Sequence, residues 1–209
     1  VDPARDAEII ETELMLSDLE VVEKAIDKIG AAAKTGDKAS RERFEILDKV
    51  RAALSAGKPA SAAGIELERL REFQFLTAKP MLYVGNVSEA GGGAAAQKLR
   101  AYAAERNAGF LEISVKLEAE LAQLDEKDRR IFLKELGREY SGLESVALAA
   151  RELLGLISFF TSGPDESRAW HVRKGDTAPT AAGKIHSDIE RGFIRAEIYA
   201  FDDLDKLGS

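Results

Sequence analysis

Apolar residues recur every three or four positions along the first part of the chain. Between residues 6 and 34 they are interspersed with acids and lysines, which predicts one long amphipathic helix. Thr35-Gly36-Asp37 interrupts the pattern, a second helix follows, and a third, short helix is expected at 65–73. Two long helices joined by a short polar turn predict an antiparallel hairpin. The periodic positions are Ile9, Ile10, Leu14, Leu16, Leu19, Val22, Ile26 and Ile29, then Phe44, Leu47, Val50 and Leu54.

The pattern changes after Lys79-Pro80. Short apolar runs at 81–85 and 110–115 predict strands, and an Ala-rich helix between them begins at Gly91–Gly93 and ends near residue 106. A strand, a helix and a strand within so short a stretch predict a βαβ unit with parallel strands. Further helices are expected at 117–124, 126–137 and 143–155.

A third pattern begins near Leu156 and predicts the start of a small α+β unit. Strands are expected at 157–161, 169–172 and 193–201, the last from its alternation of apolar and polar residues. Phe159, Phe160 and Phe193 are expected to pack in its core.

Composition excludes several classes of protein. Apolar residues make up 45% and charged residues 32% of the chain, as is usual for a soluble globular protein. The formal net charge of −7 disfavours a uniformly basic nucleic-acid-binding protein, and no DNA specificity is expected. Cysteine is absent, which excludes disulfides, thiolate zinc sites and Cys nucleophiles. No apolar run reaches the roughly 18 residues of a membrane helix, so no membrane partner is expected.

Motif searches assign no catalytic and no metal-binding residue to this chain. The P-loop pattern G-x-x-x-x-G-K-[ST] is not met at Gly36, which Asp37 follows, nor at Gly57-Lys58, which Pro59 follows. His171 and His186 are the only histidines, too few to form a metal site by themselves.

The glycine run offers one alternative function, that of a dinucleotide-binding oxidoreductase. Gly91–Ala96 fits G-x-G-x-x-A, and Glu112 follows it as the acidic residue of that fingerprint. Residues 86–90 separate the strand from the first glycine, however, and Glu112 falls inside the second strand. A flexible loop is the better interpretation of the run.

Asn86-Val87-Ser88-Glu89 lies where the first strand ends, the position at which open α/β sheets bind ligands. P-loop GTPases carry N-K-x-D at the corresponding place, and its Asp accepts hydrogen bonds from N1–H and the amino group of guanine. Adenine has an acceptor lone pair at N1, so a carboxylate in that position repels it. A glutamate changes the reach and the angle and is expected to weaken the preference for guanine. A simple polar strand end is the competing interpretation.

Several blocks together resemble the Obg-like ATPases of the YchF type, in order and along nearly the whole chain. The resemblance implies a helical coiled-coil insertion at 1–75, the C-terminal half of a P-loop nucleotide-binding domain at 76–155 and the truncated start of a β-grasp TGS domain at 156–209. The expected fold class is α/β, with a parallel sheet and flanking helices. The blocks are Val1–Asp6, Ile9–Leu14, Phe75–Pro80, Tyr83–Glu89, Phe159–Gly163, Arg168–Trp170, Ala178–Gly183 and Ile185–Glu197.

The resemblance also implies an activity and partners. Members of the family hydrolyse ATP, in preference to GTP, with Mg²⁺, associate with ribosomes (the large subunit or the 70S particle) and are linked to translation and stress responses in the cytoplasm. The P-loop, the switch segments and the Mg²⁺-binding Ser/Thr of the family are expected before Val1, and the end of the TGS domain after Ser209. We therefore expect this chain alone not to hydrolyse ATP.

By the same resemblance, four residues are expected at the nucleotide base. The Asn86 side chain is expected to hydrogen-bond the base edge, and Val87 to contact adenine through its backbone. Glu89 replaces the guanine-reading Asp, and Ser114 is expected to contact the base through its backbone. The Gly91–Ala96 run replaces a more polar stretch of the family and is expected to make this loop more mobile.

A non-catalytic module that docks on the ribosome or on RNA is the second hypothesis. The helical hairpin and the last part of the chain would then supply the contacts. The stretch 164–201 carries as many acidic as basic residues, so charge balance is the competing explanation of its cations. These cations are Arg168, His171, Arg173, Lys174, Lys184, Arg191 and Arg195.

Overall fold

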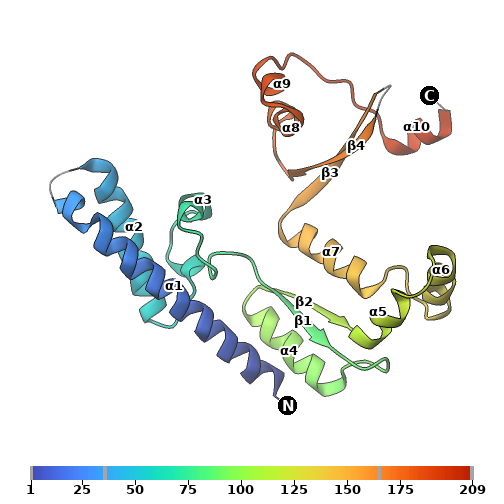
Figure 1. Ribbon diagram of the computed structural model, residues 1–209, viewed down its shortest axis with the longest axis horizontal. Helices are drawn as coiled ribbons and strands as arrows, with labels where there is room; N and C mark the ends of the chain where they lie inside the picture. Colours follow the sequence, from blue (N-terminus) through green and yellow to red (C-terminus); the bar gives the residue numbers. More distant parts are fainter. Residues whose placement is uncertain (1, 35–36, 164–165, 208–209) are drawn as a thin grey trace. The chain divides into compact units, whose positions relative to one another are not determined.

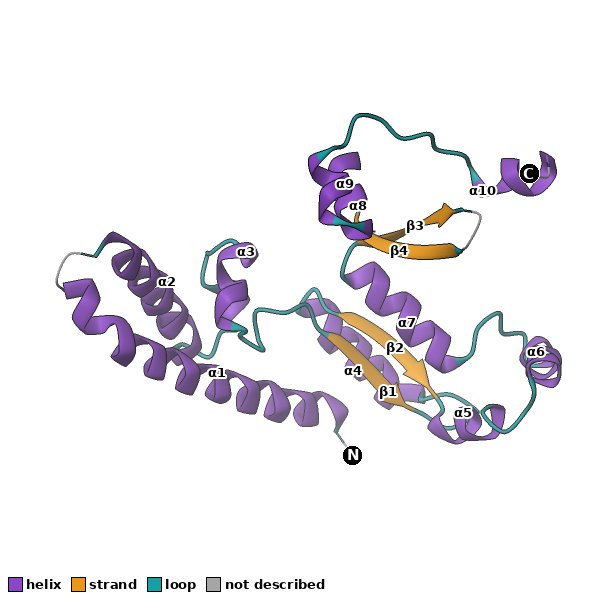
Figure 2. Ribbon diagram, turned by 45° about the horizontal axis from the view of Figure 1, so that its top comes forward, coloured by secondary structure: helices purple, strands orange, loops and turns teal. Residues whose placement is uncertain are grey.

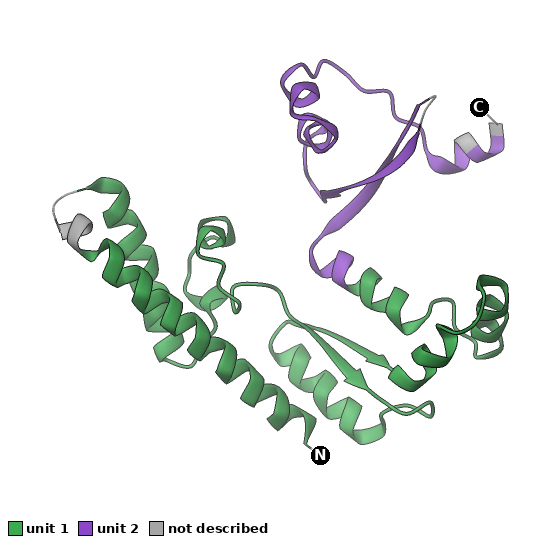
Figure 3. Cartoon of the chain, in the orientation of Figure 1, with its two compact units in different colours: residues 1–149 green, residues 150–209 purple. Residues whose placement is uncertain are grey.

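The computed structural model describes residues 2–34, 37–163 and 166–207 (Figure 1). The chain divides into two compact units, residues 1–149 and 150–209 (Figure 3). Each unit is described by itself. The first contains both the helical hairpin and the parallel strands, so these two predicted parts pack together within one unit.

The predicted hairpin is formed by α1 (Pro3–Lys34) and α2 (Lys38–Ser55), which pack along each other. Asp37 caps α2 by accepting a hydrogen bond from the Ser40 backbone N–H at 2.8 Å. The apolar stripe predicted along α1 is buried only in part. Val22 is fully buried, whereas Ile9, Ile10 and Leu16 near the start of the helix are at least half exposed.

The hairpin shares its core with the segment that follows α2. This segment contains η1 (Ala60–Ala62), α3 (Leu67–Leu70) and η2 (Arg71–Phe73), so the single short helix expected at 65–73 is divided in two. Because the segment folds back onto α1 and α2, the core joins all three. Its buried members are Val22, Ile46, Leu47, Val50, Leu54, Ala60, Leu70 and Phe75.

Asp18 is a carboxylate at the centre of this packing and only 1% exposed. It accepts hydrogen bonds from the backbone N–H groups of Leu76 and Thr77, both at 2.8 Å, and from the Thr77 hydroxyl at 2.6 Å. The Thr77 hydroxyl oxygen in turn accepts the Ala60 N–H at 2.8 Å. Each buried polar group thus has a partner, and α1 is fastened to the chain just before the first strand.

The βαβ unit follows as predicted, with β1 (Leu82–Asn86), α4 (Gly93–Glu105) and β2 (Gly109–Ile113). The strands are parallel, with Leu82 opposite Gly109 and Asn86 opposite Ile113 (Figure 2). Helix α4 packs on both strands and also contacts α1. Val84 on β1 is 40% exposed, because among the described residues α1 and α4 cover the strand pair only in part.

Three helices follow close to their predicted positions: α5 (Val115–Leu121), α6 (Glu126–Glu135) and α7 (Gly142–Leu153), of which residues 150–153 belong to the second unit. Glu118 of α5 accepts hydrogen bonds from the first N–H groups of α7, those of Gly142 at 2.7 Å and Leu143 at 3.2 Å. A side chain on α5 therefore caps α7 and holds the two helices together.

The second unit is built on an antiparallel pair, β3 (Leu156–Ser162) and β4 (Ser167–Arg173), both longer than predicted. Two helices that the sequence pattern did not predict follow, α8 (Ala178–Ile185) and α9 (Ser187–Arg191). Phe160 was expected in the core but is 68% exposed, since it lies on the face of the hairpin opposite Val172.

The strand predicted at 193–201 is wrong. Residues 193–200 have no regular secondary structure, and Phe201 begins a helix, α10 (Phe201–Leu207). A strand needs a neighbouring strand to accept and donate its backbone hydrogen bonds, and no described strand pairs with this segment. The alternation is real, but Ile194 and Ile198 are 91% and 86% exposed.

No helix among the described residues is both long and apolar enough to cross a lipid bilayer.

Candidate functional site

The carboxyl ends of β1 and β2 lie side by side because the strands are parallel. Asn86 ends β1 opposite Ile113, which ends β2, so the segments that follow the two strands leave the sheet at one edge. The four residues that the sequence singled out, Asn86, Val87, Glu89 and Ser114, all lie on these two segments. The parallel register therefore brings together residues that are up to 28 positions apart in the sequence.

Asn86 is exposed, and its carboxamide is held in place from one side. Its Oδ1 accepts a hydrogen bond from the backbone N–H of Val115, the first residue of α5, at 3.2 Å. The amide nitrogen of Asn86 remains as a donor. A donor of this kind can bind an acceptor on the edge of a heterocyclic base.

Val87 and Ser114 both use polar groups that a ligand could otherwise bind to make hydrogen bonds within the protein. The Val87 N–H donates to the Ile113 carbonyl at 2.8 Å, so a backbone contact from Val87 to a base has to come from its carbonyl oxygen. Ser114 is 1% exposed, and its hydroxyl caps α5 by accepting the Leu117 N–H at 3.4 Å. Its carbonyl accepts the Glu118 N–H at 3.0 Å. Ser114 thus positions α5, and its role at a base remains a prediction.

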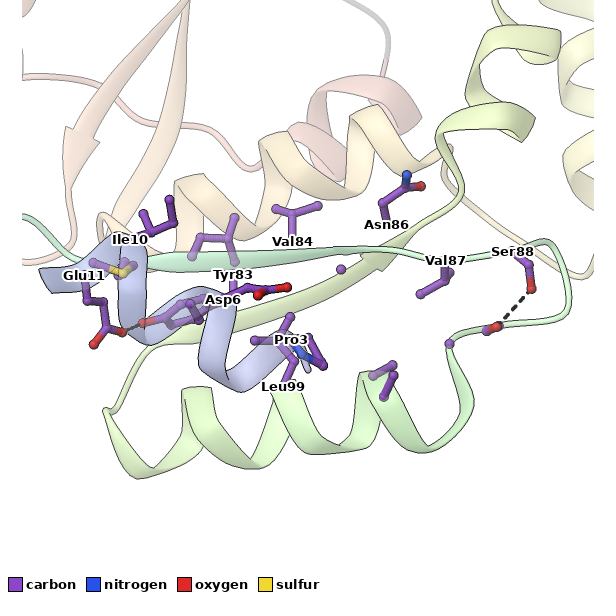
Figure 4. A pocket seen from close by; sticks show the side chains of 18 residues that line it. Pro3, Asp6, Ile10, Glu11, Tyr83, Val84, Asn86, Val87, Ser88 and Leu99 are labelled. Atoms are coloured by element: carbon purple, nitrogen blue, oxygen red, sulfur yellow. Dashed lines mark hydrogen bonds between the residues drawn. The ribbon is translucent and has the colours of Figure 1, made fainter. Parts of the chain in front are cut away.

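Glu89 lies at the tip of a tight turn closed by Ser88 and Gly91. The Gly91 N–H donates to the Ser88 carbonyl at 2.9 Å, and the Ser88 hydroxyl donates to the Gly91 carbonyl at 3.1 Å (Figure 4). The Glu89 carboxylate forms an ion pair with Lys116 of α5, with 3.0 Å between Oε1 and Nζ. Hydrogen bonding to Glu89 raises the pKa of Lys116, so its ammonium group stays charged.

The glycine run that follows this turn has a local structural explanation. A Cβ on Gly92 would lie 2.4 Å from the Ala96 Cβ and 2.5 Å from Val87 Cγ1, so only glycine fits there. Glu112 accepts the Gly92 N–H at 3.3 Å and forms an ion pair with Arg100 at 3.0 Å. The glycines and Glu112 thus hold the start of α4, which removes the reason to infer a dinucleotide site here.

A groove of about 740 Å³ runs along β1 between the start of α1 and α4, and it reaches Asn86 and Val87 (Figure 4). Its far end is closed by Glu11 of α1, which hydrogen-bonds the hydroxyls of Tyr83 and Tyr102 and forms an ion pair with Arg106 at 3.2 Å. Burial, together with the Glu11 carboxylate, raises the pKa of Tyr102 to about 12, so its hydroxyl remains a donor. This cluster fastens α1 to the βαβ unit.

Comparison with known proteins decides the family. The chain is 44% identical over 212 aligned residues to the ribosome-binding ATPase YchF of Bacillus subtilis (strain 168), covering 98% of this chain and 58% of the relative. The corresponding protein of Escherichia coli O157:H7 is 40% identical over 208 residues, covering 97% and 57%. The chain belongs to the YchF family.

Structure and family model agree with this assignment to the YchF family. The solved structure of the Schizosaccharomyces pombe YchF GTPase matches 99% of this chain with a TM-score of 0.79 and 32% identity, and 58% of that chain is covered. A model for the C-terminal part of YchF GTPases, described as a protein of unknown function (DUF933), matches residues 156–209. The α/β fold class and the family resemblance expected from the sequence are confirmed. The chain spans a little under three fifths of the relatives it matches.

Sequence reasoning did not reveal the contacts of two residues of the candidate site. No role was predicted for Lys116, and Glu112 was considered only as the acid of a dinucleotide fingerprint. Both make side-chain contacts with residues about 20 or more positions earlier in the sequence, to Glu89 and to Gly92. A Lys that follows Ser114 and Val115 carries no sequence signal for such a contact.

Proposed function

We propose that this chain supplies the base-recognising part of a ribosome-associated P-loop ATPase that prefers ATP to GTP. The observation that carries the proposal is the position of Asn86 and Glu89 at the shared carboxyl edge of β1 and β2, with Asn86 Oδ1 held by the Val115 N–H. Ligands bind at this edge in open α/β sheets. The relatives named ribosome-binding ATPases support the reaction and the partner.

Each residue of the proposed site offers the base a different hydrogen-bonding group. Asn86 offers an amide donor to a base, and Val87 offers its carbonyl. Glu89 stands at the tip of its turn, where a longer side chain than Asp changes both reach and angle. Adenine has no N1–H and so needs no acceptor at that position. We therefore propose that this site, with Glu89, accommodates adenine better than a site with Asp in its place.

The phosphate part of the reaction is not assigned to this chain. Among the described residues, no three or more His, Asp or Glu side chains are grouped so that they could hold a metal ion. The Mg²⁺ of such ATPases is bound mainly through a Ser/Thr hydroxyl, water and the phosphates, and we propose no ligand for it within this chain. Phosphoryl transfer depends on groups that position and neutralise the phosphates. We therefore propose that the 209-residue chain alone does not turn over ATP; a phosphate-release assay on a clean preparation checks this, and steady turnover abolished by Asn86→Ala contradicts it.

The base site is tested by Asn86→Ala in the full-length protein, with ATP and GTP affinities measured by calorimetry. We expect both affinities to fall by up to about tenfold, the equivalent of one hydrogen bond to the base. The unchanged protein is expected to bind ATP more tightly than GTP. Gln97→Ala removes an exposed carboxamide on nearby α4 and serves as the matched control, which should bind as the unchanged protein does. Equal affinities for Asn86→Ala and Gln97→Ala contradict the proposed site.

The location and the three-part organisation belong to the same proposal. A ribosomal partner places the protein in the cytoplasm, and the coiled-coil insertion, nucleotide-binding half and TGS start keep their proposed limits at 1–75, 76–155 and 156–209. RNA contact by the last part has less support. Arg168 is stacked over the Trp170 ring at 4.5 Å, and Arg191 is paired with Asp188, so two of its cations already have partners within the unit.

A further inference from the structure

Two consecutive residues of α5 hold Asn86 and Glu89, the two side chains of the 86–89 motif that we propose to face the base. Val115 donates its N–H to the Asn86 carboxamide at 3.2 Å, and Lys116 pairs with the Glu89 carboxylate at 3.0 Å. Asn86 and Glu89 are three positions apart on the segment after β1, and their partners are adjacent on the segment after β2. The start of α5 therefore sets how the motif presents its hydrogen-bonding groups.

The Lys116–Glu89 pair does little for folding. The side chain of Lys116 is 75% exposed and that of Glu89 is 54% exposed, and exposed ion pairs contribute little because water competes for both charges. The turn that carries Glu89 is closed independently by Ser88 and Gly91. The main effect of the pair is therefore on the hydrogen bonds that the Glu89 carboxylate can accept.

A carboxylate can read guanine because guanine presents two donors, N1–H and the exocyclic amino group, to its two oxygens. In this chain Oε1 of Glu89 already accepts from an ammonium group, which is itself a charged donor. A second donor at that oxygen competes with Lys116 and is repelled by its charge. Adenine brings no N1–H to the carboxylate, and the ammonium charge offsets the repulsion between the carboxylate and the adenine acceptor.

We propose that Lys116 is a specificity-determining positioning residue that acts through Glu89 to disfavour guanine relative to adenine. The inference rests on the proposed base site and adds to it a residue outside the Asn86–Glu89 motif. Lys116 also forms a second, longer ion pair with Glu120 on the next turn of α5, at 3.9 Å. The 3.0 Å contact with Glu89 is the shorter one.

The test is Lys116→Met in the full-length protein, with dissociation constants for ATP and GTP measured by calorimetry at one salt concentration. We expect the GTP affinity to rise about two- to fivefold, the scale of an exposed ion pair, while the ATP affinity does not rise. Lys127→Met removes an exposed lysine of α6 and is the control for the change in net charge. Lys116→Arg keeps the cation and is expected to keep the ATP-to-GTP ratio of the unchanged protein.

A double-mutant cycle shows whether Lys116 acts through Glu89. In a Glu89→Gln background, Lys116→Met is expected to leave the ATP-to-GTP ratio unchanged, because no carboxylate remains to be neutralised. An unchanged ratio in Lys116→Met alone, or the same shift with and without Glu89, overturns the inference while leaving the base site standing. Failure of the unchanged protein to bind either nucleotide overturns the proposed function and the inference together.

Discussion

Asp18→Ala is expected to lower the free energy of unfolding of the first unit by about 3–5 kcal/mol, because it leaves two backbone N–H groups, one of them buried, and a buried hydroxyl without their acceptor. The three donors come from Leu76 and Thr77, at 2.6–2.8 Å from the carboxylate. Urea unfolding of the 209-residue chain followed by circular dichroism measures the change. The loss should appear as a lower midpoint at an unchanged dependence on urea.

The control for this prediction is Asp27→Ala, which removes an exposed carboxylate from the same helix. A surface change of that kind is expected to alter stability by no more than about 0.5 kcal/mol. If the two variants unfold alike, the carboxylate at position 18 contributes nothing beyond helix surface charge, and the account of the network is wrong.

Phe75→Ala is the second large effect that we expect, again about 3–5 kcal/mol of unfolding free energy, since it empties a fully enclosed site. Phe75 is 1% exposed, lies in the core shared with α1 and α2, and stacks against Phe73 with ring centroids 5.5 Å apart. Phe75→Leu keeps most of the volume and is expected to cost less than about 1.5 kcal/mol. Thermal and urea unfolding of the same chain measure both.

Leu76→Ala is the matched control for the change at Phe75. Leu76 is the next residue along the chain but is 41% exposed, and its backbone N–H, which Asp18 accepts, is untouched by the substitution. We expect a loss of less than about 1 kcal/mol. A loss at Leu76 as large as that at Phe75 would show that the segment, rather than the ring, is what the core depends on.

The periodicity of apolar residues correctly predicted the elements that pack within one segment or against segments near them in the sequence. The long helices α1 and α2 and the strands β1 and β2 follow the apolar pattern. The same pattern placed Ile9 and Ile10 on the buried stripe of α1, where they are exposed, because burial depends on what covers the helix at each turn. Alternation at 193–201 indicated a strand, yet pairing with another strand decides whether one forms.

The candidate site was predictable as a position but not as a set of contacts. The sequence identified Asn86 at the end of a strand, and the family resemblance implied its partners Val87, Glu89 and Ser114. It did not reveal that Val115 and Lys116 hold Asn86 and Glu89, because these contacts depend on the register of two parallel strands. Asp18 lies among exposed acids of α1 and has no local mark of burial, since its three donors come from residues almost 60 positions later.

Two sets of contacts, one in the first third of the long helix α1 and one near its middle, fasten the helix to the rest of the first unit. Glu11 hydrogen-bonds Tyr83 on β1 and Tyr102 on α4. Asp18 hydrogen-bonds the backbone of Leu76 and Thr77. Beyond Asp18 the helix continues to Lys34, a reach of about 24 Å at 1.5 Å per residue, so a tilt of about 10° moves that end by about 4 Å. This part of α1 is packed on α2 and on the hairpin core, so a tilt of the hairpin carries α1 with it. Through the contact of Glu11 with Tyr83, such a tilt would reach β1 as a much smaller displacement.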